Sequence, residues 1–351
     1  MTLFAENWTR PAAVDDSQEP LVIKEQGSFA FAGSVVERSD GSTVHVDTGY
    51  VRYQIPVNAK KHAIVMWHGY GQTGRTWETT PDGREGYDSI FLRRGYPVFI
   101  VDQPRRGRAG TSSVGTTIAS ADDEGAFFFT DQNVFESFRL GTWAPGGEPV
   151  YNEGAAFPQT PGALKQYLSQ VTASTGPDGF EPETIELFSD AIAGLIDDIG
   201  PSILLIHSTA GAYGYRAAIK SSEIRGLVAY ETSPFAFPES MPPAELAFDI
   251  PELANWVDPD FVPDADFDRL TQIPVQVVFG DYTKGHFEAE AEHQRAAQFI
   301  ETLQARGGDA ELLNLTERGL TGNTHFAFSD RNSLQIADLL SEWLDAHGFG
   351  D

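Results

Sequence analysis

The sequence of 351 residues contains no cysteine, which excludes disulfide bonds, thiolate metal sites and cysteine nucleophiles. Lysine is also scarce, with only six among the 24 basic residues. Against these stand 51 acidic residues, which give a net charge of −27. A surface of this charge repels nucleic acids and anionic lipids and disfavours strongly anionic substrates. We therefore expect chemistry on oxygen and nitrogen groups, with neither nucleic acid nor membrane as a partner.

Long apolar runs are missing as well. No stretch approaches the roughly 18 to 20 consecutive apolar residues of a membrane-spanning helix, although 41% of the residues are hydrophobic and a large core is possible. The first twenty residues have no basic start followed by an apolar block, the pattern of a secretory signal. We expect a cytoplasmic protein. The alternative is a secreted or periplasmic protein whose leader has been removed.

Short apolar runs alternate with helical spacing along most of the chain. Residues 21–55 alternate apolar and polar side chains, which predicts antiparallel strands at the leading edge of a sheet. The later apolar runs are continuous, as in parallel strands buried on both faces. The order favours an α/β-hydrolase fold, a mostly parallel sheet flanked by helices. Strands are predicted at 62–67, 97–101, 202–206, 224–230, 273–279 and 311–315. Helices are predicted at 87–96, at 183–199, from the residues after Asp281 to about 305, and at 332–346.

Two stretches interrupt this order within what we expect to be a single domain, 1–351. Residues 112–182 are rich in Gly, Pro, Ser, Thr and aromatic residues. An aromatic-rich insertion between core strands is typical of a lid, and the alternative is a set of surface loops whose aromatic side chains pack on the core. Residues 233–268, rich in proline and acidic residues, form a second excursion.

The strand at 202–206 runs directly into His207-Ser208-Thr209-Ala210-Gly211 and then into helix-forming residues. A serine at such a turn exposes its hydroxyl beside free backbone N–H groups, which makes Ser208 a candidate nucleophile. Ile206 and Ala210 stand where the G-x-S-x-G pattern has glycine. The alternative is an ordinary serine that caps a helix.

A serine nucleophile needs a base and an acid that orients the base. His325 lies in a loop of Gly, Asn and Thr between the final strand and the last helix, the place of the histidine in this fold, although many loop histidines are simply solvated. Two carboxylates compete for the acid. Asp281 ends the strand at 273–279 and Glu231 ends the strand before it. Spacing alone favours Asp281, and either residue could instead cap a helix or a turn.

The oxyanion produced by attack on an acyl carbon needs two backbone donors. Thr209 supplies the first, and the sequence His-Gly-Tyr-Gly at 68–71, which could also be a tight turn, offers the second through Tyr70. His68 and His207 flank these positions, where we expect them to shape the site by packing and hydrogen bonds. The candidate substrate-binding residues are His68, Gly69, Gly71, His207, Phe127, Phe128 and Trp143.

Three blocks of the chain resemble the bacterial serine esterases of the esterase 713 type, a branch of the α/β hydrolases. They are residues 68–110, the segments 207–211 and 231–234 taken together, and 322–344. The resemblance covers about half of the chain. It implies a catalytic triad of Ser208, Glu231 and His325, and so favours Glu231 over Asp281. The elbow departs from the family at Ile206, where glycine is usual.

We therefore predict a hydrolase of carboxylic esters that forms an acyl-enzyme on Ser208. We expect a hydrophobic or aryl ester as the substrate, no metal or other cofactor, and a possible homodimer. Two alternatives remain. The same triad could act on a lactone, an amide or a C–C bond beside a carbonyl, or the scaffold could bind a small ligand without catalysis.

Overall fold

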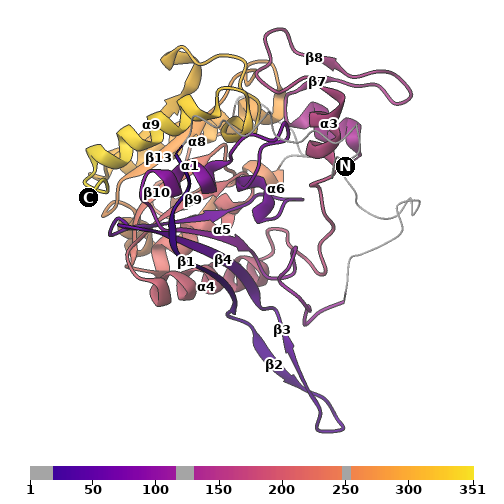
Figure 1. Ribbon diagram of the computed structural model, residues 1–351. Coiled ribbons are helices and arrows are strands. Elements are labelled where there is room, and N and C mark those ends of the chain that lie inside the picture. Colours follow the sequence, from indigo (N-terminus) through magenta and orange to yellow (C-terminus); the bar gives the residue numbers. More distant parts are fainter. Residues whose placement is uncertain (1–18, 116–129, 247–253) are drawn as a thin grey trace, which may run out of the picture.

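The computed structural model describes residues 19–115, 130–246 and 254–351 (Figure 1). An eight-stranded sheet has the order β1-β4-β6-β5-β9-β10-β13-β14. The first two strands are antiparallel to their neighbours and the remaining strands run parallel to one another. The mostly parallel sheet with an antiparallel leading edge is thus confirmed. The strands are β1 (Ile23–Phe31), β4 (Gly49–Pro56), β6 (Val98–Asp102), β5 (Ala63–Trp67), β9 (Ser202–His207), β10 (Ile224–Tyr230), β13 (Val275–Phe279) and β14 (Ala310–Asn314).

Helices cover both faces of the sheet, which explains why its central strands are apolar throughout. Along β9, Leu204 and Ile206 belong to one hydrophobic cluster, while Ile203 and Leu205 belong to the other. Each such side chain contributes roughly 1.5–3 kcal/mol when it is fully buried. Helices α4 (Pro182–Ile199), α5 (Ala210–Lys220) and α8 (Phe287–Ala305) pack in the first cluster, and α1 (Tyr87–Arg93) and α9 (Ser333–Ala346) in the second. The 3-10 helices among the described residues are η1 (Gly74–Trp77), η3 (Leu315–Arg318) and η4 (Ala327–Ser329), which lie in the loops.

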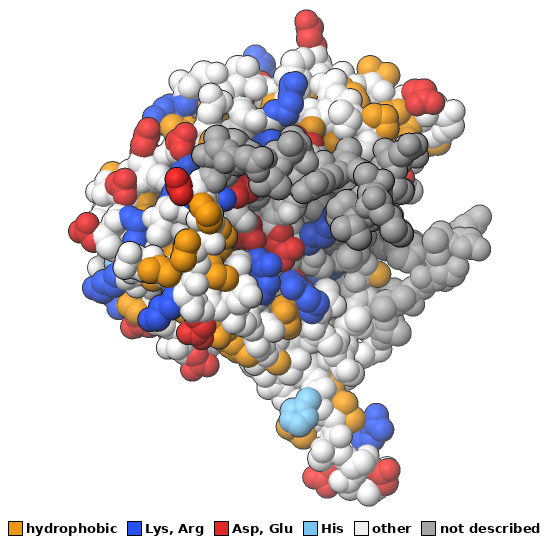
Figure 2. Space-filling view, in the orientation of Figure 1, with side chains coloured by type: hydrophobic (Ala, Val, Ile, Leu, Met, Phe, Trp, Pro, Cys, Tyr) orange, Lys and Arg blue, Asp and Glu red, His pale blue; other side chains and the backbone are white. Residues whose placement is uncertain are grey.

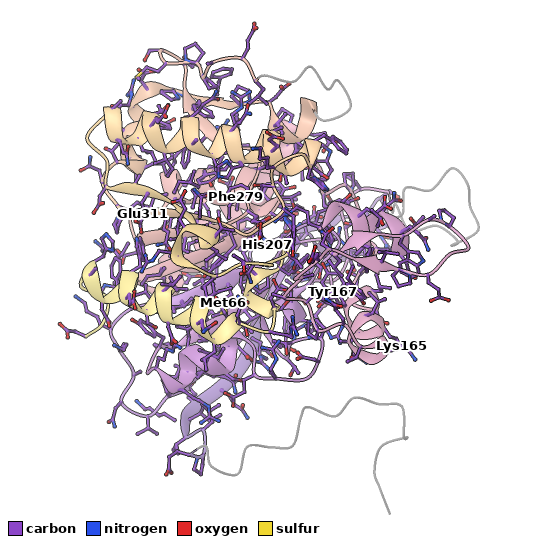
Figure 3. All side chains as sticks on the ribbon, turned by 90° about the horizontal axis from the view of Figure 1, so that it is seen from above. Met66, Lys165, Tyr167, His207, Phe279 and Glu311 are labelled. Carbon is purple, nitrogen blue, oxygen red and sulfur yellow. The ribbon has the colours of Figure 1, made fainter. Side chains whose placement is uncertain are left out.

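The aromatic-rich insertion packs on the second cluster through its own rings. Phe135 lies edge-on to Trp143 and Tyr151, with ring centroids 5.7 and 5.0 Å apart. In Figure 3, Tyr167 lies toward the body of the molecule while Lys165, on the same helix, points away from it. A role as a lid stays a prediction, and Phe127 and Phe128 fall outside the described residues. The described elements of the insertion are α2 (Asp131–Ser137), β7 (Gly141–Thr142), β8 (Val150–Tyr151) and α3 (Pro161–Leu168).

The proline- and acid-rich excursion lies against α5 and α8. It contains β11 (Ala236–Pro238), α6 (Ala254–Val257), β12 (Asp260–Val262) and α7 (Asp264–Leu270), and β11 and β12 pair in parallel. In the described ranges 19–115, 130–246 and 254–351, no helix combines the length and the apolar character that crossing a bilayer requires.

A hairpin projects from the antiparallel edge of the sheet. It consists of β2 (Ser34–Glu37) and β3 (Thr43–Val46), which extend the line of β1 and β4 beyond a bend at Ala32. Figure 2 shows it clear of the body of the protein, with charged side chains at its tip.

Candidate active site

Ser208 occupies a strained turn between β9 and α5. Its φ of +55° lies in the left-handed region, a conformation that costs a non-glycine residue on the order of 1–3 kcal/mol and persists where surrounding contacts enforce it. The Ser208 N–H donates to the Tyr230 carbonyl (3.0 Å), and the Ser208 carbonyl accepts from Ser233 N–H (3.2 Å) and Gly211 N–H (3.0 Å). This strand, turn and helix geometry is that of a nucleophile elbow.

The structure explains how the elbow accommodates Ile206. A Cβ atom on Gly214, within α5, would lie 2.8 Å from Ile206 Cδ1 and 2.9 Å from Cγ2. The space that a glycine before the serine usually provides is therefore supplied by a glycine on the following helix. The second glycine of the G-x-S-x-G pattern stands one position later than usual, at Gly211. A Cβ atom there would lie 2.9 Å from Thr232 Cβ, so this position also favours glycine.

The loop at 68–71 lies directly against the serine. A Cβ atom on Gly69 would be 2.7 Å from Ser208 Cβ, so only glycine allows this approach. His68 is fully buried, and its Nδ1 lies 2.8 Å from the Gly69 carbonyl. Burial lowers the pKa of His68 to about 4, so the ring is neutral. The Gly71 carbonyl accepts from Thr172 N–H (2.7 Å), which ties this loop to the end of the insertion.

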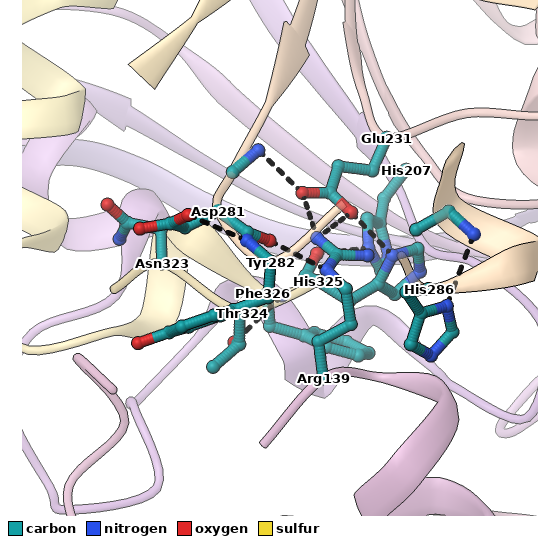
Figure 4. Close-up of polar contacts among 12 residues, drawn as sticks. Arg139, His207, Glu231, Asp281, Tyr282, His286, Asn323, Thr324, His325 and Phe326 are labelled. Atoms are coloured by element: carbon teal, nitrogen blue, oxygen red, sulfur yellow. Dashed lines mark hydrogen bonds and ion pairs between the residues drawn. The ribbon is translucent and has the colours of Figure 1, made fainter. Parts of the chain in front are cut away.

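Glu231 directly follows β10, and strand register brings it beside the serine. Tyr230 pairs with His207, so the next residue on each strand is Glu231 and Ser208 respectively. His325 Nδ1 lies 2.9 Å from Glu231 Oε2 (Figure 4). Because an ionised carboxylate only accepts hydrogen bonds, Nδ1 carries the hydrogen and Nε2 keeps a lone pair.

Electrostatics favour a neutral imidazole beside an ionised carboxylate. Burial lowers the pKa of His325 below its usual value, although Glu231 acts in the opposite direction. Burial by itself would raise the pKa of Glu231, but the Arg139 charge and the His325 hydrogen bond bring it down to about 2. The Gly280 N–H also donates to Glu231 Oε1 (2.7 Å). At neutral pH the pair therefore consists of a free base and a carboxylate.

Asp281 contacts the histidine loop rather than the histidine. Its Oδ2 accepts from Gly322 N–H (2.8 Å), its Oδ1 accepts from Tyr282 N–H (2.7 Å), and its own N–H donates to the Asn323 carbonyl (2.8 Å). Within the described residues, no hydrogen bond joins the Asp281 carboxylate to His325. Its contacts hold the start of the loop that carries the imidazole.

Asp330 supports the same loop from the other side. Its carboxylate accepts hydrogen bonds from Thr324 N–H (2.7 Å), Thr324 Oγ1 (3.1 Å) and Asn323 Nδ2 (3.2 Å). Burial raises the pKa of Asp330 to about 7 against the effect of these donors.

Comparisons with known proteins agree with this geometry. No family model matches the chain. A probable secreted lipase, phiG, of a fungal species (strain ATCC 74256) is 32% identical in an alignment of 334 positions that covers 85% of each of the two chains. The solved structure of a bacterial esterase is 30% identical to this chain, the match covers 94% of this chain and 98% of that one, and the two superpose with a TM-score of 0.76. The chain belongs to the α/β-hydrolase superfamily. As the sequence predicts, this α/β-hydrolase is a carboxylic ester hydrolase.

Two other predicted site residues of this α/β-hydrolase, His207 and Trp143, have different surroundings. His207 is buried, and its Nε2 lies 3.0 Å from the His325 carbonyl, which joins the elbow to the histidine loop. Trp143 lines a cavity of about 620 Å³ whose lining contains neither Ser208 nor His325. Among the described contacts, Ser208 Oγ makes no hydrogen bond with His325, and such bonds often form only when substrate binds.

Arg139 of this α/β-hydrolase was not predicted from the sequence. It lies in the insertion, 92 positions from Glu231, and its Nη2 donates to both carboxylate oxygens of that residue. The sequence feature that could have indicated it is a single arginine between Phe138 and Leu140 in an aromatic-rich stretch. An arginine buried among apolar residues requires an acidic partner, so this position pointed to a buried ion pair. No group of three or more His, Asp or Glu side chains within the described part of the chain is arranged to hold a metal ion.

Proposed function

We propose that this hydrolase cleaves esters through a triad in which Ser208 is the nucleophile, His325 the general base and Glu231 the acid. One observation carries the proposal. The imidazole of His325 is hydrogen-bonded to Glu231 at 2.9 Å, at the sheet edge where Ser208 sits in a left-handed turn. Asp281, the other candidate acid, binds backbone N–H groups instead.

In the first half-reaction, Nε2 of His325 takes the proton of Ser208 as Oγ attacks the acyl carbon. The carbonyl π electrons move onto oxygen, where the N–H groups of Tyr70 and Thr209 stabilise the charge. Within the described residues, the Thr209 N–H makes no other hydrogen bond. The tetrahedral intermediate collapses, the bond to the alcohol oxygen breaks, and the imidazolium returns the proton to the leaving alcohol.

The second half-reaction releases the acid. His325 removes a proton from water while the resulting hydroxide attacks the acyl carbon of the ester on Ser208. Collapse of this second intermediate breaks the bond to Ser208 Oγ, which regains its proton from the imidazolium. Glu231 remains ionised throughout and stabilises the positive charge that forms twice on His325.

Aromatic side chains around the site support a preference for hydrophobic or aryl esters. The Phe138 ring stacks on the imidazole of His325, with centroids 4.9 Å apart and planes 8° apart. Trp256 lies edge-on to Tyr70 at 6.0 Å. A long charged group beside these rings would lose hydration without gaining a partner.

Compartment and assembly stay predictions from the sequence. The name of the fungal relative describes it as secreted, so a cytoplasmic location and export from the cell both stay predictions for this chain. Cell fractionation of the producing organism separates them, and sedimentation of the purified protein tests the homodimer.

The test of the proposed function is turnover of p-nitrophenyl esters of increasing chain length, combined with labelling by an organophosphonate. We expect Ser208→Ala to abolish both turnover and labelling with an unchanged circular dichroism spectrum. Ser221→Ala is the matched control, because Ser221 is buried but bonds Asp197, and it should retain activity. Labelling of Ser208→Ala at the wild-type rate would contradict the proposal. Turnover of lactones or amides in preference to esters would reassign the substrate bond.

A further inference from the structure

Arg139 joins the insertion to the ends of two core strands. Its guanidinium is buried, its Nη2 donates to both oxygens of Glu231, and its Nε donates to the Asp281 carbonyl (2.9 Å) (Figure 4). Its backbone is held in the left-handed region at φ +62°, and its carbonyl accepts from Asn152 Nδ2 (2.9 Å). Side chain and backbone are therefore both fixed.

We propose that Arg139 is a positioning residue for catalysis, through which the insertion orients the Glu231 carboxylate toward His325. The proposal rests on the function proposed above and adds a fourth residue to it. Arg139 need not touch the substrate, because it acts through Glu231.

The argument starts from the cost of a buried carboxylate. An ionised carboxylate out of water is stable only when charged or hydrogen-bonding groups compensate it. Among the described residues, the donors to Glu231 are His325 Nδ1, Gly280 N–H and Arg139, of which Arg139 carries a permanent positive charge. Without Arg139, the buried carboxyl would bind a proton more readily.

Protonation of Glu231 would disturb the base as well. A neutral carboxyl group is a weaker acceptor and can itself donate, so it no longer fixes the hydrogen of His325 on Nδ1. Arg139 also lowers the pKa of His325 by charge repulsion, after the larger effect of burial. Loss of the guanidinium should therefore make both members of the pair bind protons at higher pH.

Other titratable groups also face this pair, and the experiment must separate them from it. Two carboxylates of α8 interact with Arg139, and burial raises the pKa of both. Because both carboxylates also interact with the Arg139 charge, the arginine variants are compared again in a Glu288→Gln/Glu292→Gln background, where a remaining difference in the pH profile reports on the Glu231 and His325 pair. The facing groups are Tyr167, His207, His286, Glu288, Glu292 and Asp330.

The test is the pH profile of kcat and kcat/KM for Arg139→Gln and Arg139→Lys. For Arg139→Gln we expect the acid limb to move upward by about one pH unit or more and kcat at pH 7 to fall about 100-fold, with KM within about threefold. Activity should partly return near pH 9. Arg139→Lys keeps the charge but loses the planar guanidinium, so its acid limb should stay at the wild-type position while kcat falls about three- to tenfold.

Arg105→Gln is the matched control. Arg105 also has a left-handed backbone (φ +68°), is buried, and pairs with a carboxylate, Asp47, at 3.0 Å. No described contact joins it to the triad. We expect Arg105→Gln to lose stability while its pH profile keeps the wild-type midpoint.

The outcomes separate this inference from the proposed function. A wild-type pH midpoint and a wild-type kcat in Arg139→Gln would overturn the positioning role while Ser208→Ala remains inactive. An active Ser208→Ala would overturn the triad itself. If Arg139→Gln does not fold, Arg139→Lys decides alone: a fall in kcat with unchanged KM supports the inference, and a wild-type kcat refutes it.

Discussion

Replacing Glu231 and Asp281 one at a time gives the sharpest test of which carboxylate orients the imidazole. Glu231→Gln keeps the side-chain shape but loses the charge that fixes the His325 hydrogen on Nδ1. The corresponding change in a serine protease costs about 10⁴-fold in kcat, and we expect roughly 10³- to 10⁴-fold here, or about 4 to 5.5 kcal/mol of transition-state stabilisation.

Asp281→Asn should behave differently because, in the part of the chain that the structure describes, the Asp281 carboxylate accepts hydrogen bonds from Gly322 N–H and Tyr282 N–H alone. The amide oxygen can keep one of these bonds, and loss of the other costs about 0.5–1.5 kcal/mol. We expect a small fall in stability and a fall in kcat of about tenfold or less.

The assay is kcat on a p-nitrophenyl ester at pH 7.5, with urea unfolding of each variant as the control. Glu231→Gln also leaves the Arg139 guanidinium buried without an ionised partner, which destabilises proteins by about 3–5 kcal/mol, so rates must be corrected for the folded fraction. A larger loss of kcat in Asp281→Asn than in Glu231→Gln would refute the assignment.

Three further predictions follow from the site. The pKa of Glu231 falls to about 2 in the folded protein, so its ionisation contributes roughly 3 kcal/mol to the free energy of unfolding. This contribution is present above the unfolded pKa near 4.5 and is lost as the pH falls through 2. Urea unfolding at a series of pH values should show the loss in the wild type and not in Glu231→Gln. Gly69→Ala should lower kcat/KM about 100-fold with little loss of stability, because the new Cβ displaces Ser208; a wild-type rate would contradict the close approach. Gly214→Val should destabilise the fold by about 1–3 kcal/mol by overpacking Ile206, and Ile206→Ala in the same chain should recover part of the thermal stability.

The order of core elements could be predicted because a strand that is buried on both faces of the sheet consists of a continuous run of apolar residues. The apolar run at 224–230 coincides with β10, and the run at 202–206 gives β9 within one residue. Helical spacing at 183–199 predicted α4. The insertion was different, since its short elements are held by ring contacts between residues distant in sequence, such as Tyr167 and Phe326, which no local periodicity reveals.

Part of the candidate site could also be predicted from the sequence. Ser208 and His325 follow from their positions after strands, because the carboxyl ends of parallel strands meet at one edge. The acid could not be chosen from spacing, since Glu231 and Asp281 both end neighbouring strands; the resemblance to known esterases indicated Glu231, the residue that contacts His325. Arg139 escaped prediction because its partner depends on how the insertion folds.

The pairing of His207 with Tyr230 also bears on how this enzyme can be altered. Ser208 and Glu231 each directly follow the last paired residue of β9 and β10, which are adjacent strands. The pairing of these strands, and not a loop, therefore fixes the distance between the two residues. Replacing residues 236–270, from the start of β11 to the end of α7, to change substrate scope should therefore leave that separation intact. A one-residue deletion inside β10 should abolish turnover even if the protein still folds.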